Sequence, residues 1–282
     1  MLLREDYHCR APVATCYGAI MWTDIIDVRD FYDSPVGVVA RRMIRRRVRA
    51  FWPDVTGMRV LGIGFATPYL LPLMDESDRV IAAMPAPQGV LHWPSNADGL
   101  TVLTDEMELP FEDLSVDRVL LVHALENAEP VRPLLREIWR ILSGSGKLLI
   151  VAPNRRGVWA LRERTPFGHG RPYSRRQLST LLRDTMFTPL QTETALFVPP
   201  IRSRMLLSSS SAWEKVGRAA FSRFGGVIVA EASKQIYAGQ PVSTAVNRRY
   251  VIATSGTPGG NSRTAEPKAV ARGHPDALKI GK

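Results

Sequence analysis

The chain has 282 residues and a net charge of +10, from 37 Lys and Arg against 27 Asp and Glu. This length fits one large α/β domain or a domain with a subdomain, and no apolar stretch approaches the roughly 20 residues of a membrane-spanning helix. The positive charge indicates a nonspecific affinity for polyanions but does not define a partner.

Both cysteines, Cys9 and Cys16, lie among the first 20 residues. Their number and position exclude a disulfide framework and a four-cysteine zinc site. A folded region without cysteines is consistent with a reducing cytoplasm, and we predict that location. His92 has no cysteine or acidic partner at ligand spacing, and His123, His169 and His274 lie far apart in sequence, so we predict no metal site.

Residues 1–20 show neither a helical period nor turn residues in a recognisable order. We therefore expect Met21 to be the true start and residues 1–20 to be a mis-assigned or disordered extension. The alternative is a secretory signal, because the run 11–21 has the length of an apolar signal core. Glu5 and Asp6 argue against it, since signal peptides begin with basic residues.

The first predicted helix runs from Ser34, a good N-cap followed by proline, to about residue 51. Its apolar residues recur every three to four positions, which predicts one buried face. The other face carries arginines at 41, 42, 45, 46, 47 and 49. This face either binds phosphates or a membrane surface, or is simply solvated. The solvated face is the favoured interpretation, because no aromatic residue stands between the arginines to stack on bases.

Strands and helices alternate over the next hundred residues. Strands are predicted at 58–64, 78–84, 100–105, 116–125 and 147–153, and helices from residue 68 and at 130–142, the latter closed by the turn 144–146. This alternation predicts an α/β fold with a doubly wound, mostly parallel sheet. Ligands of such sheets bind beyond the carboxyl ends of the strands.

The remaining sequence predicts further elements on the same sheet. A basic loop at 154–173, with a short helix at 157–164, is followed by a helix at 174–187, a strand at 188–200, a helix at 211–224 and a strand at 226–237. From about residue 255 the chain is rich in Gly, Pro, Ser and charge, which predicts disorder.

Residues 109–154 contain a series of short motifs in a fixed order. These are Leu109-Pro110-Phe111, Asp117-Arg118-Val119, Leu125-Glu126-Asn127, Leu142–Gly146 and Leu149–Pro153. Their order and spacing resemble the second half of class I S-adenosylmethionine (SAM)-dependent methyltransferases, closest to the branch called methyltransferase type 11. With the glycine turn at 62–64, the resemblance covers about residues 30–250. It implies a Rossmann-like fold and SAM as the cofactor.

The resemblance also implies a division of the chain. We expect a methyltransferase-like domain at 21–254, with a cofactor half at about 34–153 and a substrate and lid half at about 154–254. Residues 255–282 would form a disordered tail.

The glycine motif of the family is degenerate here. Gly62 stands where the family has an acid, and Ala66 and Pro68 stand at two of its glycine positions, whereas Gly64 is retained. The second strand ends without the acid that receives the ribose hydroxyls. Losing two charge-assisted hydrogen bonds costs roughly 3–6 kcal/mol of binding free energy, a factor of about 10² to 10⁴ in affinity.

Asp105 matches the family's aspartate that receives the adenine amino group, and Met107 is expected against the adenine ring. The resemblance therefore predicts a cofactor site that consists of Gly62, Gly64, Ala66, Asp105, Glu106 and Met107. Glu106, Glu108 and Gln88 are candidates to replace the missing acids.

His123 lies at the carboxyl end of the fourth predicted strand, where the reacting edge of the sheet is expected, and is the candidate general base. The alternative is a buried histidine whose ring nitrogens are satisfied within the protein. His169 lies between glycines in the predicted lid and is either a substrate contact or, more in keeping with its surroundings, a surface residue.

The predicted lid is basic. It carries arginines at 155, 156, 162, 164, 171, 175 and 176. Such a lid suits an anionic acceptor, although the same residues are also compatible with RNA or with a solvated surface. The sequence thus predicts a SAM-dependent methyltransferase of unknown acceptor with a variant cofactor site. The alternative is an inactive relative of the fold that serves as a binding or regulatory module, with RNA as one partner.

Overall fold

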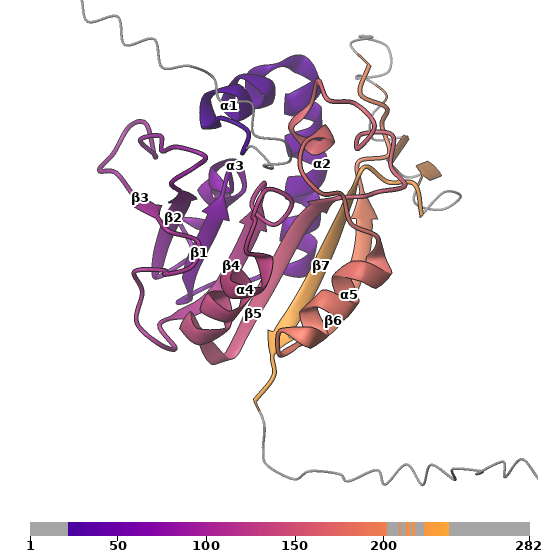
Figure 1. Cartoon of the computed structure of the whole chain (residues 1–282). Helices are drawn as coiled ribbons and strands as arrows, with labels where there is room; N and C mark the ends of the chain where they lie inside the picture. The colour runs from indigo at the N-terminus through magenta and orange to yellow at the C-terminus, as the bar shows by residue number, and fades with distance from the viewer. Residues whose placement is uncertain (1–21, 202–208, 210–212, 215, 218–222, 237–282) are drawn as a thin grey trace, which may run out of the picture. The chain divides into compact units, whose positions relative to one another are not determined.

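The computed structural model describes residues 22–201, 209, 213–214, 216–217 and 223–236. Its centre is a seven-stranded sheet in the order β3-β2-β1-β4-β5-β7-β6 (Figure 1). The strands are β1 (Arg59–Gly64), β2 (Arg79–Pro85), β3 (Thr101–Thr104), β4 (Val116–Val122), β5 (Leu142–Pro153), β6 (Phe187–Ala195) and β7 (Val227–Lys234). The expected doubly wound, mostly parallel α/β fold is confirmed.

The direction of the strands changes near one edge of the sheet. The strands from β3 to β5 pair in parallel, and β7 pairs antiparallel with both β5 and β6. The chain order reverses between β1 and β4, so β1 and β4 are the neighbours at the switch point. Doubly wound sheets bind their ligands at this position, beyond the carboxyl ends of the strands.

Helices cover both faces of the sheet. They are α1 (Ile25–Asp33), α2 (Pro35–Phe51), α3 (Thr67–Leu70), α4 (Val131–Ile141) and α5 (Arg175–Asp184), with 3₁₀ turns at Leu71–Leu73 and Pro166–Gly168. Figure 1 shows α4 and α5 in front of the sheet and α2 behind it. In α2 the Ser34 hydroxyl accepts from the amide of Gly37, which confirms the predicted N-cap.

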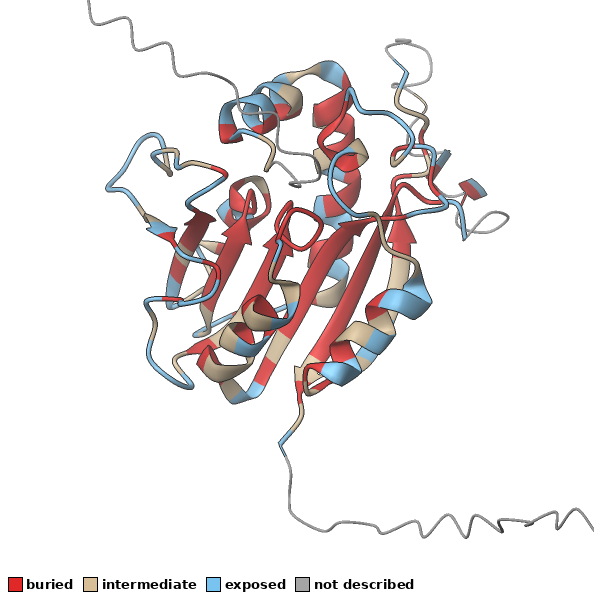
Figure 2. Cartoon of the chain, viewed as in Figure 1, coloured by how far each residue is buried: buried red, intermediate tan, exposed pale blue. Residues whose placement is uncertain are grey.

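Successive strand residues enter two separate cores. Val60, Leu120 and Val229 pack with α1, α2 and α3, whereas Leu61 and Leu121 pack with α4 and α5. This alternation is the period-two pattern of a strand, and coverage of both faces explains why the central strands are almost entirely apolar. Figure 2 shows the strands buried and the outer faces of α4 and α5 exposed.

Several predicted elements differ from the structure. Helix α1 was not predicted, and residues 157–164 form turns rather than a helix. β5 begins at Leu142, directly after α4, so the predicted turn at 144–146 is part of a strand. The described residues contain no helix between β2 and β3 or between β3 and β4.

Three expectations fall largely outside the described residues. They are the extension at 1–20, the helix at 211–224, of which six residues are described and four are helical, and the tail at 255–282. The division of residues 21–254 into a cofactor half and a lid half stays a prediction.

Candidate functional site

Gly64 ends β1 at the switch point of the sheet. Its φ of +80° lies in the left-handed region, and an added Cβ would run into the carbonyl oxygen of Val122 on β4. The amide of Phe65 donates to that same carbonyl oxygen at 2.9 Å. Glycine is therefore required here by the close approach of two strands, whether or not a ligand is bound.

Gly62 is required by the packing of α3 on β1. A Cβ at this position would lie 2.6 Å from the Cβ of Ala66 and 2.6 Å from a methyl group of Leu70. An acidic side chain, as in the resembling family, does not fit at Gly62 in this arrangement. Gly64 is thus retained because of the backbone conformation and the close approach of β4. The acid is missing at Gly62 because α3 packs on that position.

Gln88 joins the ends of β2 and β4 across β1. Its Nε2 donates to the carbonyl oxygen of His123 at 3.3 Å, and its backbone carbonyl accepts from the amide of Ile25 at the start of α1. Because β1 lies between β2 and β4, this side chain passes over the carboxyl end of β1. Both Gln88 and His123 are about 1% exposed, so the bridge is inside the protein.

A chain of hydrogen bonds connects four buried side chains in the same region. The Tyr69 hydroxyl donates to the Tyr32 hydroxyl at 2.8 Å, and the Tyr32 hydroxyl lies 2.9 Å from Nε2 of His123. Nδ1 of His123 lies 3.2 Å from a carboxylate oxygen of Glu126. One consistent assignment has Tyr32 donating to Nε2 and Nδ1–H donating to Glu126. Burial raises the pKa of the Tyr32 and Tyr69 hydroxyls, so both stay protonated.

Aromatic rings enclose this chain of hydrogen bonds. The ring of Tyr32 stacks on Phe65 with centroids 5.4 Å apart, and the ring of His123 lies 4.8 Å from that of Phe167. The φ of His123 is +53°, which is uncommon for a residue with a side chain. Such strained backbone is concentrated at functional sites, where the surrounding contacts maintain it.

Five buried side-chain oxygens at this edge of the sheet have no hydrogen-bond partner among the described residues. They belong to Gln88, Thr104, Glu106, Glu126 and Asn127. Asn127 and Gln88 both donate to the carbonyl of His123, so three of these oxygens belong to side chains that bond to His123. An unsatisfied buried polar group costs about 1–3 kcal/mol, and a ligand that brings N–H and O–H donors removes that cost.

The three residues after β3 differ in their exposure. The carboxylate of Asp105 is exposed and accepts from the amide of Met107 at 2.8 Å, and the side chain of Met107 is 55% exposed. Glu106 is buried, and its burial together with the charges of Asp105 and Glu129 raises its pKa to about 7. Asp105 is therefore free to receive a ligand from solvent, whereas Glu106 belongs to the interior.

Helix α4 fixes the loop that carries these residues. The guanidinium of Arg140 donates to the carbonyls of Leu109 and Phe111 at 2.9 Å, and Glu137 accepts from the amide of Leu109. Arg140 and Glu137 also form an ion pair. The Leu-Pro-Phe turn that the sequence revealed is thus held by two charged residues of the following helix.

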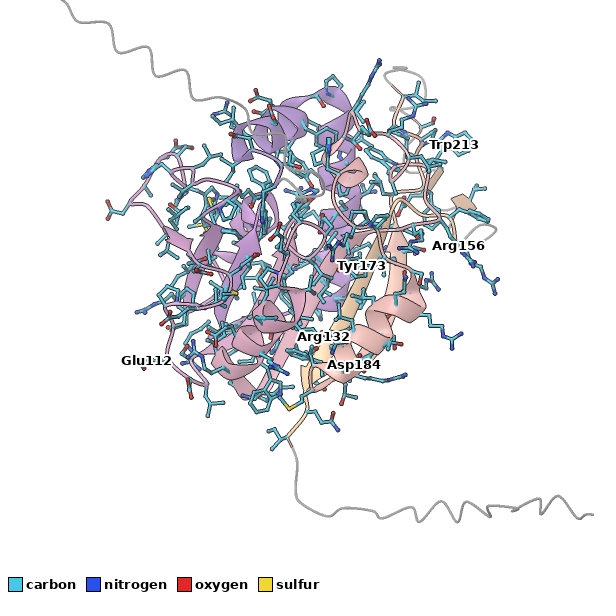
Figure 3. The ribbon with its side chains drawn as sticks, viewed as in Figure 1. Glu112, Arg132, Arg156, Tyr173, Asp184 and Trp213 are labelled. Carbon is cyan, nitrogen blue, oxygen red and sulfur yellow. The ribbon has the colours of Figure 1, made fainter. Side chains whose placement is uncertain are left out.

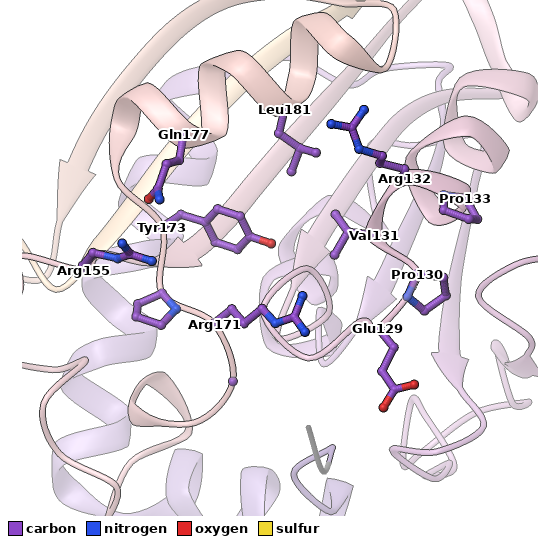
Figure 4. Close-up of a pocket in the computed structure, with 12 residues that line it drawn as sticks. Glu129, Pro130, Val131, Arg132, Pro133, Arg155, Arg171, Tyr173, Gln177 and Leu181 are labelled. Carbon is purple, nitrogen blue, oxygen red and sulfur yellow. The ribbon is translucent and has the colours of Figure 1, made fainter. Parts of the chain in front are cut away.

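A cavity of about 610 Å³ lies beside the residues that lead into α4, and Glu129–Pro133 form part of its wall (Figure 4). Arg155, Arg171 and Tyr173 line it, together with Gln177 of α5 and the start of α4. His169 does not belong to it and instead lines a cavity beside α1. Two of the predicted basic lid residues, Arg155 and Arg171, line this cavity. Arg162 and Arg164 line a different one.

The predicted site residues therefore fall into two groups. Gly62, Gly64, Ala66 and His123 are buried around the switch point between β1 and β4, a place that protein side chains fill and that we call the crevice. Asp105 and Met107 are exposed after β3. Sequence reasoning missed Tyr32 and Tyr69, because α1 was not predicted and no motif marks either residue. Both ring nitrogens of His123 have hydrogen-bond partners within the protein, which agrees with the stated alternative of a satisfied buried histidine.

The chain is similar to known methyltransferases. Residues 61–150 match the family model described as "Methyltransferase domain". A "Demethylmenaquinone methyltransferase" of Corynebacterium efficiens is 29% identical over 132 residues, which are 47% of this chain and 57% of that protein. One from Corynebacterium urealyticum is 30% identical over 109 residues, 39% of this chain and 47% of its own length. The chain thus spans about half the length of the curated relatives it matches.

Two solved structures share the fold. A SAM-dependent methyltransferase from Thermotoga maritima has a TM-score of 0.53 at 18% identity, covering 75% of this chain and 96% of that one. A methyltransferase of Haloferax volcanii, solved with the Trm112 methyltransferase activator, has a TM-score of 0.55 at 18% identity, covering 76% and 99%. In the part of the chain that the structure describes, no three His, Cys, Asp or Glu side chains form a metal-binding group, and no helix has the length and apolarity to cross a membrane.

Proposed function

We propose that this chain, which has the class I methyltransferase fold and matches the methyltransferase domain family over residues 61–150, transfers a methyl group from SAM to a small molecule. The observation that carries the proposal is the family match itself. It extends from Leu61 in β1 to Ile150 in β5, so it includes both strands of the switch point, β1 and β4.

The residues around the crevice fit SAM in part. SAM brings an ammonium group, two ribose hydroxyls and an adenine amino group, all of which need acceptors. The exposed carboxylate of Asp105 and the unpartnered oxygens of Gln88 and Glu126 supply acceptors. We expect Asp105 to receive the adenine amino group, and Gln88 and Glu126 to compensate for the acid that Gly62 replaces and for the acid missing at the end of β2.

When bound, SAM supplies an electrophilic methyl group, so the protein mainly has to position an acceptor and remove its proton. Glu126 orients His123 through Nδ1, and the protonatable atom Nε2 points to Tyr32. We propose that Nε2 takes the proton of the acceptor once the Tyr32 hydroxyl has moved aside. Binding therefore has to open the crevice that Tyr32 and Gln88 close.

The filled crevice also favours a second candidate function. Tyr32, Gln88 and His123 are each no more than 2% exposed, and they occupy the place where a cofactor would bind. An inactive relative that keeps the fold as a binding or regulatory module would show the same packing. The two candidates differ in one measurable property, the affinity for SAM.

The test is isothermal titration calorimetry with SAM and with its demethylated product, S-adenosylhomocysteine. The methyltransferase hypothesis predicts saturable heat from the folded chain, and Asp105→Ala is expected to weaken binding about 10- to 150-fold, the value of one charge-assisted hydrogen bond. Asp98→Ala, a change of the same kind at an exposed loop position, is the control. Absence of heat at millimolar SAM, with circular dichroism showing a folded sample, would favour the binding module instead.

A further inference from the structure

The cavity shown in Figure 4, which we call the arginine pocket, opens at the carboxyl end of β5 beside the crevice. Its wall consists of Glu129–Pro133, Arg155, Gly170–Tyr173, Gln177 and Leu181. Three chain segments that are distant in sequence thus meet around it. Its volume of about 610 Å³ lies within the range of small-molecule sites.

The charge in the pocket is positive and partly uncompensated. Arg132 pairs with Asp184 at 3.0 Å, and Figure 3 shows these two side chains side by side. Arg155 and Arg171 form no ion pair with any residue that the structure describes. Glu129 is the one carboxylate among the lining residues. Arginine binds carboxylate and phosphate oxygens in a two-pronged geometry, so two arginines of this kind favour an anion.

The rest of the pocket is apolar. Val131, Leu181 and the proline rings of 130, 133 and 172 line it, and the ring of Tyr173 lies between the arginines and Val131 in Figure 4. A flat apolar group can pack on the Tyr173 ring while an attached anion reaches Arg155 or Arg171. Neither a bare inorganic ion nor a neutral quinone would use both parts of this wall.

The pocket is joined to the segment that holds His123. The amide of Arg171 donates to the carbonyl of Glu126 at 2.8 Å, and the Tyr173 hydroxyl lies 3.4 Å from the carbonyl of Leu125. A Cβ at Gly170 would run into the carbonyl oxygen of Glu126, so the two segments are in close contact. A molecule in the arginine pocket therefore lies next to the segment 123–130, which carries the His123–Glu126 pair.

We propose that the arginine pocket is the acceptor site and that it takes a small molecule with a carboxylate or phosphate group on a flat apolar body. The role as acceptor site depends on the function proposed above, but the binding of an anion does not. The pocket thus selects a charged acceptor, although the Corynebacterium relatives carry the name of a quinone-type methyltransferase.

The test uses three probes with the same ring system in the absence of SAM. Naphthalene-2-carboxylate and 2-naphthyl phosphate are the anions, and naphthalene-2-carboxamide is the neutral control, each titrated by fluorescence or calorimetry. We expect the two anions to bind at least tenfold more tightly than the amide, and their affinity to fall as salt rises. The relative strength of the carboxylate and the phosphate identifies the group that the acceptor carries.

Variants locate the binding. The double variant with Arg155→Gln and Arg171→Gln is expected to lower the affinity for both anions at least tenfold and to leave the affinity for the amide unchanged. Arg183→Gln removes the same charge from an exposed position of α5 outside the pocket and is expected to change the affinity less than twofold. Because all three arginines are exposed, the variants should fold, and circular dichroism checks this.

Two results would overturn the proposal. One is equal affinity for the amide and the anions, and the other is anion binding that the double variant retains. Failure to bind SAM would refute the enzymatic function without affecting these measurements, so the two hypotheses are tested separately.

Discussion

Tyr32 is the residue on which the buried hydrogen bonds of the crevice converge. Its hydroxyl receives one from Tyr69 and contacts Nε2 of His123, and its ring stacks on Phe65. One side chain of α1 therefore links β1, α3 and β4, which no local pattern in the sequence could indicate.

The variant Tyr32→Phe is expected to lower the free energy of unfolding by about 2–3 kcal/mol, because it leaves Tyr69 and His123 each without a buried partner. Urea denaturation measures this. The control is Tyr173→Phe, whose hydroxyl is half-buried and 3.4 Å from its partner, and which should cost less than about 0.5 kcal/mol. Equal losses in the two variants would show that the buried chain of hydrogen bonds contributes no special stability.

Glu106 makes stability depend on pH. Its folded-state pKa is raised to about 7 by burial and by Asp105 and Glu129, above the ordinary value of 4.5. Between these values the folded chain binds more protons than the unfolded chain, so this residue contributes stability below about pH 4.5 and loses it as pH rises toward 7.

The variant Glu106→Gln should therefore be more stable than the wild type at pH 8, by about 1–2 kcal/mol after allowance for screening by solvent. The difference should disappear near pH 4.5. Thermal unfolding of both proteins across this range isolates the residue, since the other carboxylates cancel in the difference. A constant difference at all pH values would contradict the assigned pKa.

At the scale of elements, α3 and β1 form a tightly packed unit. The helix has only four residues before it continues as a 3₁₀ turn, and Leu70 and Ala66 press against Gly62. This packing explains why the sequence departs from the acidic pattern of the family, since an acid at position 62 and a leucine at position 70 exclude each other.

Gly62→Ala is expected to destabilise the fold by about 1–3 kcal/mol, the usual cost of overpacking a core. Gly144→Ala provides the comparison, because its Cβ would meet only the end of the flexible, exposed side chain of Ile236 at 3.3 Å. Chemical denaturation of both variants gives the result. If Gly62→Ala were as stable as Gly144→Ala, the glycine would have to be explained by a ligand and not by α3.

The same scale shows what the sequence could predict. The strands and α2, α4 and α5 followed from apolar periodicity and from caps such as Ser34 and Ser174. Helix α1 escaped because only Ile25, Val28 and Tyr32 of its nine residues are buried, so its apolar face is short. The candidate site was predicted where motifs mark it, at Gly64 and Asp105. Gln88 was predicted only as a replacement for the missing acids. Its hydrogen bond to the carbonyl of His123 was not predicted, because it joins the ends of two strands that are far apart in sequence.

At the scale of the whole molecule, the positive charge is concentrated on arginine-rich surfaces. On α2, Arg47 and Arg49 pair with Glu193 and Glu76, whereas Arg42, Arg45 and Arg46 are exposed. These three side chains are exposed, and no aromatic residue stands between them in the sequence to stack on bases. The favoured interpretation of a solvated face is consistent with this arrangement.

Binding to nucleic acid is therefore expected to be weak and nonspecific. Affinity for duplex DNA and for RNA should be similar and should fall steeply between 50 and about 200 mM salt. Changing Arg42, Arg45 and Arg46 to Gln should make the slope of log affinity against log salt concentration less steep, by at most about 0.9 per lost phosphate contact. The melting temperature should not change. Tight, sequence-dependent RNA binding at high salt, measured by fluorescence anisotropy, would instead support the RNA-binding alternative.

The Gln88 bridge also has a kinetic consequence. A ligand that fills the crevice must wait until Tyr32 and Gln88 withdraw, so the observed binding rate should level off at high SAM concentration instead of rising in proportion. The plateau then equals the rate at which α1 lifts from the end of β1. Stopped-flow traces would therefore measure the rate of this opening, and that rate would not depend on the ligand concentration.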